Sequence, residues 1–134
     1  MMRVEFIRPI DRTVRALAAK AFGWYSVNFD VPHHVRVLVV PAPCIVDRNH
    51  GSGFGVFSTR TITVRDRRVR PMIGIAGHCP QGCEYEDWLQ TLPETIFHEI
   101  AHYEQFRDGR KLQERGVAKR ALALAIECFG TEPV

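Results

Sequence analysis

Short apolar segments alternate with longer amphipathic segments along this chain. The short segments are rich in β-branched residues and are bounded by proline, glycine or asparagine, which is typical of strands. They cover 35–40, 54–57, 61–64 and 72–76. The third of these is also compatible with one arm of a hairpin. We therefore predict a small sheet built from the middle of the chain.

The segment 72–76 is the last predicted strand before the C-terminal part of the chain. Pro71 precedes it and Gly74 lies inside it. Proline cannot donate a backbone hydrogen bond and glycine weakens a strand interior, so both residues are typical of a sheet edge. We therefore predict that 72–76 is an edge strand whose unpaired backbone is open to a partner.

Three segments have apolar residues at helical spacing. The first covers 11–22. The second begins near Thr91, where Thr91 and Glu94 match a capping box, and it ends near Gly109. The third covers 111–128. This order predicts an α+β fold with an N-terminal helix, a small mostly antiparallel sheet with an edge strand, and two C-terminal helices.

Length and composition indicate one globular domain over residues 1–134. With 46% hydrophobic and 25% charged residues, the chain has enough apolar side chains for its own core. Its net charge of +3 is only mildly basic. Arginines gather at 65–70, but alternating arginines are typical of a solvated strand face, so we expect no nucleic-acid partner.

The N-terminus and the hydropathy pattern argue against export and membrane insertion. Residues 1–6 include an arginine and a glutamate and lack the apolar core of a signal peptide. The apolar run 37–46 contains two prolines and is too short to span a bilayer. We therefore expect a cytoplasmic protein without membrane contact, in which the cysteines are thiols.

Cys79 and Cys83 stand close together after the last predicted strand. Zinc sites with cysteine ligands normally use two closely spaced pairs, and this chain has one pair with loose spacing. We therefore interpret both cysteines as small packing residues in a tight loop. A redox-sensitive bridge between them is the alternative.

The most specific motif of the chain is the HExxH string at 98–102. At 3.6 residues per turn, His98 and His102 lie about 40° apart on one helix face, so both imidazoles can reach one metal ion. Glu99 stands beside them, where it can act as the general base for a metal-activated water. Two nitrogen ligands and a carboxylate that is not a ligand are the pattern of zinc peptidases. We therefore predict that His98 and His102 are metal ligands and that Glu99 is catalytic.

A zinc site needs a third protein ligand, and no histidine follows His102. The acidic candidates downstream are Glu104, Asp108, Glu114, Glu127 and Glu132. Glu104 points away from the metal on the same helix. We favour Glu114, because it shares one face of the third predicted helix with alanines that permit close approach. Glu127 is the alternative, and Glu114 could instead be a solvated acid in the first turn of that helix.

The run HEIAHYEQ at 98–105, the turn at 107–110 and Leu112-Gln113-Glu114 resemble the gluzincin metalloproteases, most of all their small minigluzincin-like and SprT-like members. The resemblance covers about residues 53–128. It implies a zincin-like fold in which an active-site helix carries HExxH and a glutamate on the following ligand helix, here Glu114, completes the zinc site. It also implies that an upstream edge strand holds the substrate.

Two features depart from this family pattern. Larger gluzincins carry an Asn-Glu-x-x-x-Asp signature, whereas here Gln113 precedes Glu114 and Ala118 occupies the aspartate position. The acid that usually orients the ligands is therefore missing. SprT-like proteins use a third histidine, which this chain lacks.

These features predict a zinc-dependent metallopeptidase with one Zn²⁺ per chain and a peptide or protein substrate. The substrate is expected to pair with the strand 72–76 by β-addition. Tyr85 is a candidate for stabilising the oxyanion, whereas Tyr103 points towards the core. The alternative is a non-catalytic or SprT-like zinc module that binds a protein or DNA partner. Glu99 argues against it, because a structural zinc site needs no base.

Overall fold

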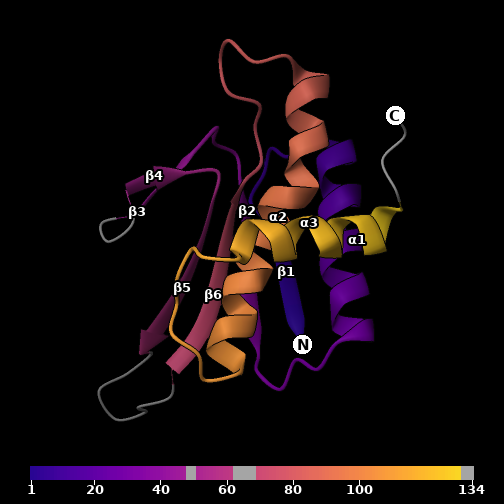
Figure 1. Ribbon diagram of the computed structural model, residues 1–134. Helices are drawn as coiled ribbons and strands as arrows, with labels where there is room; N and C mark the ends of the chain where they lie inside the picture. The colour runs from indigo at the N-terminus through magenta and orange to yellow at the C-terminus, as the bar shows by residue number, and fades with distance from the viewer. Residues whose placement is uncertain (48–50, 62–68, 131–134) are drawn as a thin grey trace.

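The computed structural model describes residues 1–47, 51–61 and 69–130, and these form an α+β fold of three helices and two sheets (Figure 1). The larger sheet has the strand order β1-β2-β6-β5. Its strands are β1 (Met2–Phe6), β2 (Val35–Val40), β6 (Val69–Ala76) and β5 (Gly55–Thr61). Strand β2 runs parallel to both β1 and β6, whereas β5 is antiparallel to β6. The larger sheet is therefore mixed.

The prediction of a mostly antiparallel sheet is wrong, because a helical crossover joins β1 to β2. Helix α1 (Arg12–Asn28) carries the chain back to the end of the sheet where β1 began, so that β2 runs parallel to it. Strand β1 is not among the predicted strands, although Val4 and Phe6 alternate with charged residues there. The helix predicted over 11–22 is confirmed and continues past Gly23.

The segment 72–76 is an interior strand and not the predicted edge. It belongs to β6, which pairs with β2 on one side and with β5 on the other. Packing explains Gly74, because a Cβ atom there would lie 3.1 Å from Val56 Cγ1 and 3.2 Å from Ile45 Cδ1. Within the described residues, the edges of the larger sheet are β1 and β5.

Helices α1 and α2 (Tyr85–Arg107) pack side by side against the larger sheet, and α3 (Val117–Phe129) crosses over both (Figure 1). The core between them includes the fully buried side chains Val14, Phe22, Val37, Ile73, Ile96, Phe97 and Leu124. A second, antiparallel sheet of β3 (Ile45–Asp47) and β4 (Gly51–Gly53) contacts β5 and β6. In the described part of the chain, no helix has the length and hydrophobicity that a membrane crossing requires.

Both C-terminal helices begin at residues other than those predicted. Helix α2 starts at Tyr85, and the hydroxyl of Thr91 donates to the Trp88 carbonyl at 2.7 Å inside the helix, so Thr91 is not an N-cap. Helix α3 starts after Gly116, whose φ of 81° is left-handed and cannot continue a helix. Residues 108–116 are therefore a loop, and Glu114 lies in this loop and not on a helix.

Candidate metal centre

Helix α2 and the loop after it bring three candidate ligands together. His98 and His102 share one face of α2, as their spacing predicted, with ring centroids 5.0 Å apart. Glu114 meets them from the loop: its Oε2 lies 3.0 Å from His98 Nε2, and its Oε1 lies 3.0 Å from His102 Nε2. No second group of three such side chains converges in the described part of the chain.

The group lies at the surface and is open on one side. The exposed side-chain fraction is 75% for Glu114 and 34% for His98, but only 11% for His102. A metal ion held here would therefore be reached by water or by a substrate from the side of His98. Two imidazole nitrogens and one carboxylate oxygen form a donor set that suits zinc.

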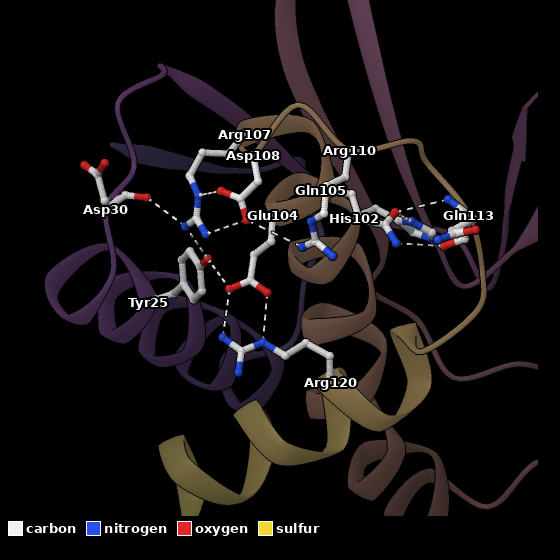
Figure 2. Close-up of polar contacts among 10 residues, drawn as sticks. All are labelled: Tyr25, Asp30, His102, Glu104, Gln105, Arg107, Asp108, Arg110, Gln113 and Arg120. Carbon is white, nitrogen blue, oxygen red and sulfur yellow. Dashed lines mark hydrogen bonds and ion pairs between the residues drawn. The ribbon is translucent and has the colours of Figure 1, made fainter.

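A buried glutamine holds both His102 and the loop. Gln105 is 4% exposed, and its Oε1 lies 2.9 Å from His102 Nδ1. The same oxygen accepts a hydrogen bond from the Gln113 backbone N–H at 3.2 Å, and Gln105 Nε2 donates to the Gln113 carbonyl at 2.9 Å (Figure 2). Because Oε1 can only accept, Nδ1 of His102 is the donor in this contact, and in the neutral ring Nε2 is left with a lone pair.

With the proton on Nδ1, the neutral His102 ring turns an acceptor nitrogen towards Glu114. A neutral Nε2 and a carboxylate oxygen are both acceptors, and two acceptors 3.0 Å apart repel each other. A second proton on the imidazole, or a metal ion between the two atoms, removes this repulsion. Two ligand atoms that share a tetrahedral zinc ion at about 2.1 Å are about 3.4 Å apart, so a small adjustment would give that geometry.

Gln105 is the site residue that the sequence analysis missed. It follows His102 by about one helical turn, so its side chain lies beside the imidazole. The sequence does contain a signal for such a residue, because Ala118 stands where gluzincins carry an aspartate. A ligating histidine normally needs a partner at its second ring nitrogen, so another side chain has to supply it. Ala118 is exposed on α3, and Gln105 supplies this partner from α2 instead.

Glu99 lies beside the three-residue group and outside it. Its side chain is 6% exposed and packs against Gly55 of β5. Burial, and then the negative charge of Glu114, raise the pKa of Glu99 to about 8. A cation in the group would favour the carboxylate form. Glu99 thus has the location and the adjustable protonation of a general base.

Glu104 points away from this group, as predicted, and joins all three helices. Its carboxylate accepts hydrogen bonds from Arg120 of α3, at 2.8 and 3.0 Å, and from the Tyr25 hydroxyl of α1, at 2.7 Å (Figure 2). Burial raises the pKa of Glu104, but the bonds from Arg120 and Tyr25 outweigh it and hold the pKa below its usual value. These bonds fix α3 against α2, and with it the end of the loop that carries Glu114.

The remaining acidic candidates do not join the group. Glu127 is exposed on α3 and lies apart from the two histidines. Asp108 forms an ion pair with Arg107 at 2.9 Å. Glu132 and the arginines at 65–68 fall outside the described residues.

The two tyrosines considered from the sequence also lie away from the group. Tyr103 is fully buried, as predicted, and its hydroxyl lies 2.9 Å from His33 Nδ1. Tyr85 is the first residue of α2, and its hydroxyl donates a hydrogen bond to Asp11. This end of the helix lies about 20 Å from His98 along the helix axis. A role for Tyr85 at the oxyanion is therefore wrong.

Cys79 and Cys83 are free thiols in the connection from β6 to α2. The Sγ atom of Cys79 lies 3.4 Å from the carbonyl oxygen of Cys83, within a tight turn closed by the bond from the Cys83 N–H to the Pro80 carbonyl. Burial raises the pKa of the Cys79 thiol. Cys79 packs against the core, as predicted, whereas Cys83 is exposed, so its interpretation as a packing residue is wrong.

Comparison with models of known protein families, with curated proteins and with solved structures found no match to this chain. The resemblance to gluzincins therefore rests on the HExxH helix and on Glu114. The function has to follow from the positions of these residues.

Proposed function

We propose that this protein is a zinc-dependent metallopeptidase of the gluzincin type. In this proposal His98, His102 and Glu114 hold one zinc ion, and Glu99 is the general base. The observation that carries the proposal is the place of Glu99, a buried carboxylate beside a group of three ligands and outside it. A structural zinc site normally has four protein ligands and needs no such carboxylate.

Each residue of the site has one task in this reaction. A zinc ion bound here supplies Lewis-acid chemistry, which polarises a peptide carbonyl and lowers the pKa of a water molecule. Glu99 takes the proton from the attacking water and delivers it to the leaving nitrogen. Gln105 holds the His102 ring so that Nε2 faces the metal.

Strand β5 offers a free backbone edge next to Glu99. The Phe54 carbonyl accepts a hydrogen bond from the Ala76 N–H at 2.8 Å, on the side of β6. Because successive residues of a strand point their backbone groups to opposite sides, the N–H and C=O of Gly55 point away from β6. No strand pairs with that side of β5 in the described part of the chain. An extended peptide can add there, which moves the proposed substrate edge from 72–76 to β5.

Glu99→Gln tests the proposal, because it removes the base and keeps the shape of the side chain. We expect the variant to bind zinc as the wild type does and to cleave an unfolded test protein, such as denatured casein, about 10²–10⁴-fold more slowly. Glu94→Gln is the matched control, since Glu94 is exposed on the same helix. It should leave the rate unchanged.

Two results would contradict the proposal. One is a Glu99→Gln variant that cleaves as fast as the wild type, which would mean that another group moves the proton. The other is a zinc-loaded wild type that cleaves no unfolded protein or peptide at all. In that case the zinc is structural, and the alternative of a non-catalytic binding module would be favoured.

A further inference from the structure

Gly55 of β5 lies directly against the carboxylate of Glu99. A Cβ atom on Gly55 would lie 2.9 Å from Glu99 Cγ, 3.0 Å from its Oε2 and 3.2 Å from its Cδ. Carbon atoms in contact are normally about 3.5–4.0 Å apart. The glutamate therefore occupies the volume that a side chain at position 55 would need.

Backbone conformation does not explain this glycine. The described glycines with positive φ are Gly82, Gly109, Gly116 and Gly130. Gly55 instead pairs with Ile75 in the regular antiparallel register of β5 and β6. An ordinary residue could adopt this backbone conformation. The close approach of Glu99 is thus the feature that restricts position 55.

An added methyl group at position 55 would move the side chain of Glu99 rather than its helix. Ile96 and Ile100 are fully buried on either side of Glu99 and hold this part of α2 in the core. A shift of a packed helix disturbs many contacts, whereas a rotation about side-chain bonds of one glutamate disturbs few. The carboxylate would therefore leave its present position.

We infer that Gly55 is a positioning residue, whose missing side chain reserves the space from which the Glu99 carboxylate serves the metal site. Its catalytic meaning rests on the proposed function. The three heavy atoms closest to a Cβ on Gly55 all belong to Glu99. Gly55→Ala should therefore displace the base and leave the zinc ligands in place.

Kinetics and zinc content test this inference together. For Gly55→Ala we expect one zinc per chain, an unchanged melting temperature within a few degrees, and a fall in kcat on the order of 10²-fold with KM changed less than about threefold. Gly23→Ala in α1 is the control, because a Cβ there would meet no atom within 4 Å and the position lies outside the proposed site. It should keep the wild-type kcat.

A double-mutant cycle separates the clash from a general disturbance of β5. Glu99→Asp shortens the side chain by one methylene and withdraws the carboxylate from the region that Gly55→Ala fills. In the Glu99→Asp background, Gly55→Ala should therefore cost less than about threefold more in kcat, so the two effects are not additive. The inference would be overturned if the two substitutions reduced kcat by the product of their separate factors. Loss of zinc from the Gly55→Ala single variant would also overturn it.

Crystal structures of the zinc-loaded wild type and of Gly55→Ala decide the inference without any activity. We expect the Glu99 carboxylate to move by more than about 1 Å while His98, His102 and Glu114 stay in place. An unmoved carboxylate would refute the positioning role even if the enzyme is active. A moved carboxylate in a protein without peptidase activity would support it, while the proposed function alone would fail.

Discussion

Gln105 and Gln113 exchange two hydrogen bonds, of 2.9 and 3.2 Å, one residue before Glu114 in the loop. The loop is otherwise exposed from Asp108 to Gly116. Ordering the backbone of a loop residue costs about 1–2 kcal/mol of conformational free energy. The two bonds at Gln113 order the loop next to Glu114 before a metal binds, so less ordering remains for metal binding to bring about. One buried side chain therefore orients His102 and holds the loop that carries Glu114.

Gln105→Ala should weaken zinc binding by about 10–100-fold, because it frees the His102 ring and loosens the loop at Gln113. The dissociation constant can be measured by competition with a chromophoric chelator at fixed pH. Gln90→Ala, in an exposed position of the same helix, is the control and should change nothing. An unchanged zinc affinity in Gln105→Ala would show that the ligands are held by other contacts.

Glu114→Ala should reduce zinc affinity by several orders of magnitude, because only His98 and His102 would remain as ligands. Glu127→Ala should retain zinc, since Glu127 lies on α3 away from the histidines. Metal content after dialysis, measured by atomic absorption, distinguishes the two variants. The reverse result would mean that the zinc site is built around the later glutamate.

Features that depend on local periodicity could be predicted from the sequence. The HExxH spacing places His98 and His102 on one helix face wherever that helix lies. The β-branched run at 35–40 likewise predicts a strand, and it is β2. Neither prediction requires knowledge of distant contacts.

Features that depend on distant packing could not be predicted. The helical spacing of alanines at 111–128 favours one helix, but the left-handed Gly116 delays α3 and leaves Glu114 in a loop. The loop, and not a helix face lined by alanines, thus brings Glu114 to the two histidines. Gly74 leaves room for the side chain of Ile45 and does not indicate a sheet edge. The position of a strand within a sheet depends on pairing with segments far apart in the chain, which a local pattern does not reveal.

Glu104 should make stability depend on pH in the acid range. Because its folded-state pKa lies below the usual value of 4.5, the carboxylate stabilises the fold above about pH 4.5, and this contribution is lost as the pH falls through the folded-state pKa. Glu104→Gln should lower the free energy of unfolding by about 1–3 kcal/mol at pH 7 and flatten its pH dependence below pH 5. Urea titrations of metal-free protein between pH 3 and 7 measure both effects.

Glu94→Gln is the control for this pH series, since Glu94 is exposed on α2. Its unfolding curve should follow that of the wild type at every pH. If Glu104→Gln also follows the wild type, the bonds from Arg120 and Tyr25 contribute nothing measurable to stability. The arrangement of α3 over α2 would then depend on apolar contacts alone.

Removal of the metal should destabilise the wild type and leave a ligand variant unaffected. The purified protein should hold about one zinc per chain, and Cys79→Ser with Cys83→Ser should keep it, because these thiols lie outside the group of ligands. Zinc at a thousandfold excess over its dissociation constant stabilises the folded state by about 4 kcal/mol. For a domain of this size, chelation should then lower the melting temperature by about 10 °C or more. In His98→Ala the chelator should have little effect on the melting temperature, since no tight zinc site remains to be emptied. If the wild type instead holds a second zinc ion that is lost when Cys79 and Cys83 are changed to serine, that ion is bound in the loop before α2.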